Sequence, residues 1–349
     1  NDRYVSEDVR RRVEAAIREL RYVPNTLART FRSGRDAAIG IAVPDVSDPF
    51  FATLTHTVEQ VARRRGVAVV VTSLGNEAAG LIEAVGAGVG GLNIGDRVAL
   101  LPGANQGLYP TYGERILFPA SHVVRHPGKL SAEQAAGAYM AYLTGYFPMF
   151  EMARLQRSQT VLVTGASSST GIAALQMARA AGLPAIATTR TAAKRQALLD
   201  AGAAHVVVTQ DEDVVERVLA LTGGRGADLV YDGVGGPQLE RLGNAVAQRG
   251  WYVLYGLSGG AEFSYPVLAQ FRKSWRFHVY TVLEFTGSAT MGLPRDEAAL
   301  GRALAFVNEG LASGALQMRI DRRFALDEVV QAHHYLERAG HIGKVVLTV

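Results

Sequence analysis

From residue 160 onward, short apolar strands alternate with amphipathic helices, and this alternation constrains the fold more than any other feature of the chain. The strand TVLVTGA is followed by a helical segment that ends near Ala181, and PAIATT by one that ends near Ala201. HVVVT, DLVYDGV and WYVLYGL continue the series. Strands separated by single helices pair in parallel, so the sequence predicts an α/β protein with a doubly wound parallel sheet.

The first strand of this series runs into a turn of small residues, GASSSTGI, at residues 165–172. In such a turn, backbone N–H groups and the helix N-terminus can hold a pyrophosphate. The pattern departs from GxGxxG, because Ala166 and Ser168 occupy the first two glycine positions and only Gly171 remains. Since the turn follows a strand and opens a helix, we expect it to bind a dinucleotide; a merely structural turn is the alternative.

The next strand ends in TTRTAAKRQ, residues 188–196. A site that prefers NADH usually has an acidic residue here, which binds the ribose 2′-hydroxyl. This chain has Arg190 and Lys194 in the region and no acid, and a 2′-phosphate requires cationic partners. The segment therefore favours NADPH, with a solvated basic turn as the alternative.

Composition excludes several kinds of site. The chain contains no cysteine, which removes disulfides, thiolate nucleophiles and cysteine-ligated zinc. His333 and His334 are neighbours on an expected helix and diverge by about 100°, so we expect no metal site. No apolar run reaches the roughly 18 residues of a membrane helix, and the N-terminus lacks a signal-peptide layout. We therefore expect a soluble, cytoplasmic protein.

Five segments between residues 76 and 349 occur in a family order and spacing: GNEAAGLIEAVGAGVGGLNIGDRV, GASSSTGIAALQMARAAG, DAGAAHVVVT, GGRGADLVYDGVGG and HIGKVVLTV. Through them, residues 76–349 resemble the medium-chain dehydrogenase/reductase superfamily, in its zinc-independent quinone oxidoreductase and enoyl reductase branch. A short-chain dehydrogenase, the main rival, would need glycine in place of Ser169 and a YxxxK motif, and the chain has neither. The resemblance implies a partial GroES-like β-barrel at 76–140, a Rossmann domain at 141–285, and helices with a strand returning to the barrel at 286–349.

The resemblance also implies a function and a site. Hydride would pass from NADPH to an electron-poor quinone or enone, and we expect a homodimer. Thr144 and Gly256 would lie beside the nicotinamide, and Asp232 would either hydrogen-bond near the cofactor or cap the turn at Gly233. Arg190 and Lys194 would hold the 2′-phosphate. The residues expected to line the pyrophosphate are Ala166, Ser167, Ser168, Ser169, Thr170 and Gly171.

No catalytic acid can be named from the sequence. In this branch the first part of the GroES-like domain helps to build the substrate pocket, and in enoyl reductases it supplies a tyrosine acid. A different kind of sequence stands in that place here. Tyr109 and Tyr112 lie in the remaining barrel segment but match no catalytic motif, so we expect them to pack against their neighbours.

That different sequence ends near Ser73 to Asn76. VSEDVRRRVEAAIREL and NTLARTFR predict two helices, and residues 37–73 predict strand, helix and strand. Residues 1–35 hold nine arginines against five acids, a surplus equal to the whole formal net charge of +4. A basic face of this kind could contact phosphate groups.

This N-terminal segment resembles transcriptional repressors of the lac-repressor family. Residues 1–36 are similar to the end of the headpiece with its hinge helix, and 37–75 to the first βαβ of the effector domain. The resemblance would place Arg29, Phe31 and Arg32 on DNA, with Phe31 as an apolar wedge in the minor groove. The DNA-reading helix of that family would precede Asn1, and sequence-specific DNA binding depends on it. We therefore expect the chain to function as an oxidoreductase. The alternatives are a DNA-binding transcriptional regulator or a chimera with impaired activity.

Overall fold

The computed structural model describes residues 38–43, 68–73, 77–105, 107–338 and 340–349. The chain divides into two compact units: Asn1–Ala42 with Thr53–Thr72, and Val43–Ala52 with Ser73–Val349. Strands β1 (Ala38–Val43) and β2 (Ala68–Ser73) form a two-stranded sheet, so both strands predicted in this part of the chain are present.

The N-terminal helices predicted before residue 37 and between the two strands lie outside the described residues. Arg29, Phe31 and Arg32 lie outside them as well. The resemblance of this segment to repressors therefore stays a prediction.

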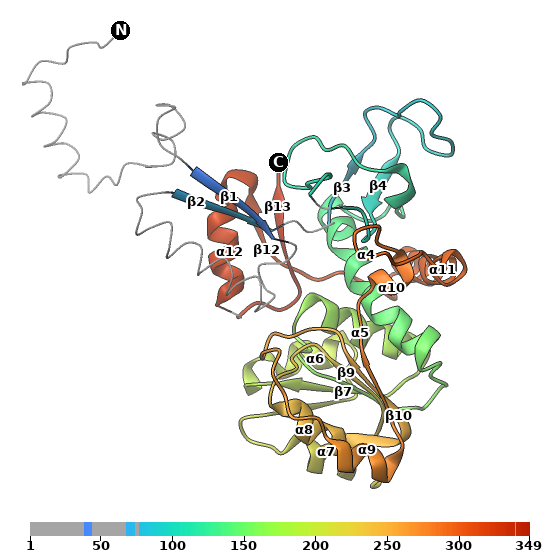
Figure 1. Ribbon diagram of the computed structural model, residues 1–349, viewed down its shortest axis with the longest axis vertical. Helices are drawn as coiled ribbons and strands as arrows, with labels where there is room; N and C mark the ends of the chain where they lie inside the picture. Colours follow the sequence, from blue (N-terminus) through green and yellow to red (C-terminus); the bar gives the residue numbers. More distant parts are fainter. Residues whose placement is uncertain (1–37, 44–67, 74–76, 106, 339) are drawn as a thin grey trace, which may run out of the picture. The chain divides into compact units, whose positions relative to one another are not determined.

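The second unit contains a six-stranded parallel sheet in the order β11-β10-β9-β6-β7-β8 (Figure 1). This order confirms the predicted doubly wound sheet, since the chain builds outward from β6 in one direction and then in the other. The strands are β6 (Val161–Val163), β7 (Ala185–Thr189), β8 (His205–Val208), β9 (Ala227–Asp232), β10 (Val246–Leu254) and β11 (Arg276–Val279).

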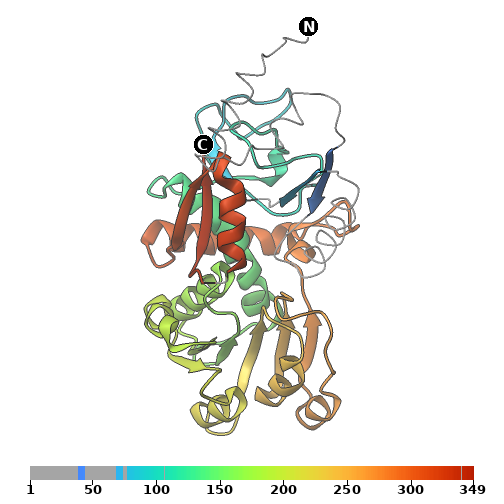
Figure 2. The same ribbon diagram turned by 90° about the vertical axis from the view of Figure 1, so that its left-hand side faces the viewer.

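Helices cover both faces of this sheet, which explains the nearly continuous apolar strands. The helices of this region are α5 (Ser169–Ala181), α6 (Arg195–Ala201), α7 (Val214–Leu221), α8 (Gln238–Leu242) and α9 (Val267–Lys273), with 3-10 turns at Ala192–Lys194 and Gly243–Ala245 (Figures 1 and 2). Val161 and Val163 belong to one core cluster with residues of α5 and α6, whereas Leu162 belongs to a second cluster with residues of α7 and α8.

Strand β10 begins five residues earlier than the segment WYVLYGL had indicated. Its pairing with β9 shifts register between Val246 and Trp251. The irregularity contains Arg249, a non-glycine residue with a φ of 60°. A bulge places polar residues inside a strand, which hides the strand from its apolar pattern.

Helix α4 (Ala132–Tyr146) runs from the barrel segment to the sheet and continues as a π-helical turn at Phe147–Met152. Ser131 and Gln134 form a capping box at its N-terminus. The helix packs closely on α5, because a Cβ atom on Gly145 would lie 2.6 Å from Cε of Met177. This close crossing fixes the end of α4 beside the parallel sheet.

The barrel segment forms a three-stranded antiparallel sheet of β3 (Ala79–Leu81), β4 (Arg97–Leu100) and β5 (Val123–Arg125), with a 3-10 turn at Ala120–His122. Short antiparallel strands joined through glycine-rich turns were predicted here, and Gly88, Gly91 and Gly95 all have positive φ.

The C-terminal part adds a separate parallel pair of strands. Strand β13, which was expected to return to the barrel, pairs with β12, and Lys344 forms a salt bridge with Glu77 just before β3. No helix of the described segments is long and apolar enough to cross a bilayer. The elements are α10 (Leu283–Thr286), α11 (Glu297–Ser313), β12 (Ile320–Ala325), a 3-10 turn (Leu326–Glu328), α12 (Val329–Glu337) and β13 (Lys344–Thr348).

Candidate functional site

The strand order places a topological switch point between β6 and β9. At such a point the loops after neighbouring strands diverge to opposite faces, which opens a crevice at the carboxyl edge of the sheet. The loops at this edge follow β6, β9 and β10, and they contain Gly165, Gly233 and Gly256. The predicted dinucleotide turn is thus at the position where doubly wound sheets bind ligands.

The turn after β6 has the local geometry of a phosphate-binding loop. Ser168 is the N-cap of α5, and its hydroxyl accepts a hydrogen bond from the Gly171 backbone N–H at 3.0 Å. A Cβ atom on Gly171 would lie 2.6 Å from Cα of Ala166. This clash could be relieved only by a shift of the backbone. Gly171 therefore serves as the glycine that allows close packing of helix and strand. At the first two glycine positions of the motif the turn has the small residues Ala166 and Ser168, and Gly165 directly before them has a positive φ of 55°.

Asp232 holds the loop after β9 in place. This fully buried carboxylate accepts hydrogen bonds from the backbone N–H groups of Val234 (2.9 Å) and Gly235 (3.2 Å). It also accepts from the hydroxyls of Tyr252 (2.6 Å) and Thr164. Of the two roles predicted for Asp232, the observed hydrogen bonds are those of turn capping, and they also tie β6, β9 and β10 together.

The loops after β9 and β10 touch through their backbones. A Cβ atom on Gly256 would lie 2.7 Å from the carbonyl oxygen of Gly233, and the Gly259 N–H donates to the Val234 carbonyl at 2.7 Å. Gly256, predicted to lie beside a nicotinamide, is therefore joined to the same crevice as the turn after β6. Glycine is required there because no side chain fits between the two loops.

Tyr255 is a residue of this crevice that sequence reasoning missed. Its ring stacks on Tyr231 with centroids 4.0 Å apart and an interplanar angle of 17°. Its hydroxyl would lie 2.5 Å from a Cβ atom on Gly233, and a hydrogen bond with the Ser168 side chain contributes to its electrostatics. Burial raises the pKa of Tyr255, so the phenol stays neutral. The only sequence signal was an aromatic residue directly before Gly256.

Two cations stand at the end of β7, as predicted. Arg190 is exposed, whereas Lys194 is partly buried and donates hydrogen bonds to the Ser167 hydroxyl (3.1 Å) and to the His341 carbonyl (2.9 Å). Burial and repulsion from Arg190 lower the pKa of Lys194, and Asp321 partly opposes them. An anion placed between the two cations would relieve this repulsion.

A segment from the far end of the chain also borders the turn. The Gly343 N–H donates to the Ser167 carbonyl at 2.9 Å, and Ser168 forms an isolated bridge with Gly343. Together with the bond between Lys194 and His341, these contacts fix residues 341–343 against the predicted pyrophosphate site. The sequence carried no signal for this contact, because nearly 150 residues separate Lys194 from His341.

Thr144 lies in the last turn of α4, where its hydroxyl donates to the Met140 carbonyl at 2.6 Å. A Cβ atom on the next residue, Gly145, would lie 3.7 Å from the Tyr231 hydroxyl. The helix end that carries Thr144 therefore meets the sheet beside the stacked tyrosines. Its predicted contact with a nicotinamide stays a prediction.

The sequence of this chain is similar to those of known dehydrogenases and reductases. The zinc-binding dehydrogenase family matches residues 169–296, which include α5 and most of the parallel sheet. Quinone oxidoreductase 1 of Escherichia coli is 31% identical over 278 residues, covering 79% of this chain and 82% of that protein. The chain belongs to the quinone oxidoreductase family. This match confirms the predicted quinone oxidoreductase branch of the medium-chain dehydrogenase/reductase superfamily, and the chain is therefore an oxidoreductase.

Solved structures of this family agree with the fold. The crystal structure of E. coli quinone oxidoreductase in complex with NADPH matches with a TM-score of 0.70 and 29% identity, over 79% of this chain and 82% of that one. The mycobacterial protein Rv1454c, also in complex with NADPH, matches with a TM-score of 0.68 and 28% identity, over 79% and 82%. The predicted α/β fold is confirmed.

Other relatives are much longer than the match. The synaptic vesicle membrane protein VAT-1 homolog of Danio rerio is 27% identical over 78% of this chain, which spans only 57% of that protein. A highly reducing polyketide synthase of Gibberella zeae is 30% identical over 80% of this chain, but over only 12% of its own length.

Tyr109 and Tyr112 of the barrel segment pack against neighbouring aromatic rings, as the sequence predicted. The Tyr109 ring meets Phe118 edge-on with centroids 6.0 Å apart. The Tyr112 ring lies 6.3 Å from His333 of α12. Neither contact involves the loops after β6, β9 and β10, so Tyr109 and Tyr112 pack against neighbouring rings as expected.

Proposed function

We propose that the protein is an NADPH-dependent, zinc-independent oxidoreductase that reduces an electron-poor quinone or enone. The observation that carries the proposal is the capped, closely packed turn at the switch point, next to Arg190 and Lys194. The relatives named as quinone oxidoreductases, one of them solved with NADPH, and the NADPH complex of mycobacterial Rv1454c support the same reading.

The residues fit the coenzyme at both ends. Gly171 leaves no room for a side chain between α5 and the turn, so a pyrophosphate can approach the helix N-terminus at Ser169 and Thr170, while the N–H groups of Ser168 and Gly171 bond within the turn. The ammonium of Lys194 already contacts the Ser167 hydroxyl, and Arg190 stands nearby to complete a 2′-phosphate site. Thr144 and Gly256 would border the nicotinamide.

NADPH, when bound, supplies the hydride, and the chain's own residues bind and orient it. Asp232 fixes the loop after β9, and that loop supports Gly256 through backbone contact. The rings of Tyr231 and Tyr255 stack on each other beside Gly233 of this loop. Since the chain has no cysteine, its substrate carbonyl is not activated by a thiolate-held zinc ion.

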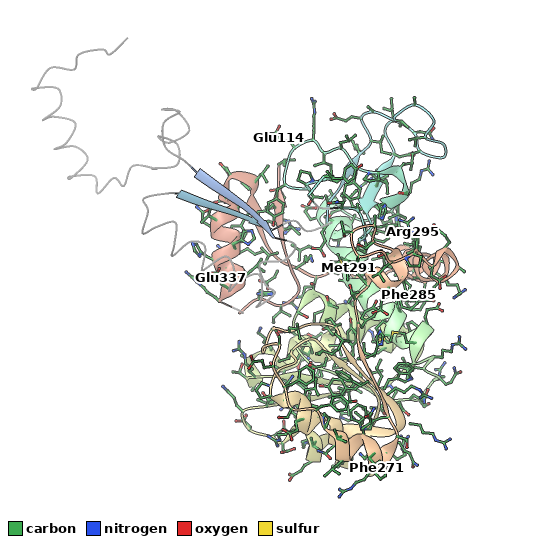
Figure 3. All side chains as sticks on the ribbon, in the orientation of Figure 1. Glu114, Phe271, Phe285, Met291, Arg295 and Glu337 are labelled. Atoms are coloured by element: carbon green, nitrogen blue, oxygen red, sulfur yellow. The ribbon has the colours of Figure 1, made fainter. Side chains whose placement is uncertain are left out.

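We further propose a homodimer formed along the edge of the parallel sheet. Strand β11 is an edge strand of the described sheet, and Val279 at its end is 61% exposed. On the preceding helix α9, Leu268 is 71% and Phe271 83% exposed (Figure 3). An edge strand beside large exposed apolar side chains is suited to a second copy of itself. Light scattering after gel filtration should give twice the chain mass, and Phe271→Asp should lower it toward the monomer.

A thermal-shift titration with NADPH, NADH and duplex DNA tests the function, followed by quinone-dependent oxidation of NADPH. At a hundredfold excess over Kd, NADPH should stabilise the fold by about 2.7 kcal/mol. No response to either coenzyme, together with salt-sensitive binding of a specific duplex, would overturn the proposal in favour of the DNA-binding regulator.

A further inference from the structure

His341 occupies an unusual position beside the proposed 2′-phosphate site. Its carbonyl accepts the Lys194 ammonium at 2.9 Å, and two residues further on Gly343 is bonded to the Ser167 carbonyl at 2.9 Å. The segment that carries His341 is therefore held against the coenzyme turn on one side and against Lys194 on the other.

The imidazole of His341 is incompletely bonded. Its Nδ1 atom is buried and has no hydrogen-bond partner among the described residues. A buried polar atom of this kind costs free energy unless a ligand or water completes it. The nearby carboxylate of Asp321 is already engaged, because it accepts from the Tyr335 hydroxyl at 2.7 Å and from the Ile342 N–H at 3.2 Å.

Burial and the surrounding charges lower the pKa of the His341 imidazole in the free protein. Burial lowers the pKa of His341, and the cations of Lys194 and Lys344 lower it further, while Asp321 acts in the opposite direction. Lys344 forms a salt bridge with Glu77, which weakens its effect. Arg190 adds positive charge beyond Lys194. A bound phosphate would cancel the positive charge of these cations.

We propose that His341 is a third contact for the 2′-phosphate of NADPH and takes up a proton from solvent when that coenzyme binds; this rests on the proposed function. A 2′-phosphate carries a charge of about −1.5 to −2 near neutral pH, which reverses the local electrostatics. The imidazolium then donates a charge-assisted hydrogen bond to a phosphate oxygen. NADH lacks the phosphate and causes no uptake, so His341 acts as a specificity-determining residue.

The contribution of His341 depends on pH in a defined direction. The protonated imidazole is required for the contact, so its contribution to NADPH affinity is largest below neutral pH and is lost at alkaline pH. The part of the preference for NADPH over NADH that comes from His341 therefore falls as the pH rises.

Isothermal titration calorimetry of the full chain with NADPH and NADH tests this, in buffers of different ionisation enthalpy at pH 6 to 8.5. We expect net proton uptake with NADPH and none with NADH. His341→Gln should abolish most of that uptake and weaken NADPH about tenfold at pH 6 and about twofold at pH 8.5, with NADH unchanged. His334→Gln, an exposed change on α12, is the matched control and should alter neither quantity.

The outcomes separate the two proposals. If the wild-type protein prefers NADPH but His341→Gln keeps the same uptake and affinity, the role of His341 is overturned and the proposed function stands. If the wild-type protein binds neither coenzyme, the proposed function itself fails, and the role of His341 fails with it. The wild-type uptake needs no variant, so a misfolded substitution cannot obscure the result.

Discussion

The loops at the carboxyl edge of the parallel sheet and the barrel segment at 77–130 are both rich in glycine, but they use it differently. At the sheet edge, a Cβ atom on Gly171 or Gly256 would lie within 2.7 Å of backbone atoms. In the barrel segment, Gly90 and Gly91 meet nothing within 4 Å, although a Cβ atom on Gly103 would lie 2.5 Å from the Gly287 carbonyl oxygen. Close approach therefore requires glycine at Gly171 and Gly256, whereas the turns at Gly90 and Gly91 lie in open space.

Exposure of apolar side chains shows the same contrast. The central strand β6 is wholly buried, while Leu81 in β3 is 65% and Leu117 is 82% exposed. Buried, closely packed loops are preorganised for a ligand. Close packing therefore fixes the loops around the proposed coenzyme site, whereas the described barrel residues are packed less closely.

The strongest way to break the contrast is Gly171→Ala. The added methyl group would displace the backbone at Ala166, so we expect loss of stability of about 2–3 kcal/mol and at least a hundredfold weaker binding of NADPH. Chemical denaturation and calorimetry measure the two effects. Gly90→Ala is the matched control in open space and should change neither. Equal effects of the two substitutions would mean that packing does not distinguish the regions.

Asp232→Asn should have the next largest effect on stability. The amide keeps the size of the side chain but replaces one of the two accepting oxygens by NH₂. It therefore loses the acceptor either for Val234 N–H or for Gly235 N–H and the Tyr252 hydroxyl. Buried donors left unpaired cost about 1–3 kcal/mol, so we expect a loss in this range by urea denaturation. Asp211→Asn, at an exposed site, should cost less than about 0.5 kcal/mol. A neutral result for Asp232→Asn would refute its role in holding the loops.

Arg190→Ala sharpens the comparison without disturbing the fold. Removal of one cation from the proposed 2′-phosphate site should weaken NADPH about tenfold and leave NADH within about twofold. Arg272→Ala on α9 is an exposed control with the same loss of charge. Fluorescence titration of both coenzymes gives the ratio. An equal loss for NADPH and NADH would contradict the assignment of Arg190.

The smallest expected effect lies in the barrel segment, at His122. Burial and the neighbouring Arg295, whose guanidinium lies 2.9 Å from Nε2, lower the pKa of His122 to about 4. The unfolded chain protonates at about 6.5, so this site stabilises the fold fully above pH 6.5 and loses that contribution as the pH falls toward 4.

Because the site is only partly buried, we expect about 1 kcal/mol from His122 over this range. The measurement compares denaturation of wild type and His122→Gln at pH 7 and pH 4.5. The wild-type protein should lose more stability than the variant on acidification. Equal losses would show that His122 contributes nothing to the acid sensitivity.

Local signals explain what the sequence could predict. The apolar runs predicted the sheet, and the small residues after β6 predicted the turn, since both depend on neighbours along the chain. Arg190 and Lys194 were predictable because their charge follows directly after a strand. The roles of Tyr255 and His341 were not, because they depend on loops that meet only in the folded chain. The two contacts of Lys194 illustrate this, since Ser167 and His341 lie on opposite sides of it in the sequence.

The most direct test of the central claim is the ratio of the dissociation constants for NADH and NADPH, measured on the wild-type chain by calorimetry at pH 7. The packed turn with Arg190 and Lys194 predicts that NADPH binds with one-to-one stoichiometry per chain and at least about tenfold more tightly than NADH. Equal affinity for the two coenzymes, tighter binding of NADH, or binding of neither would contradict it.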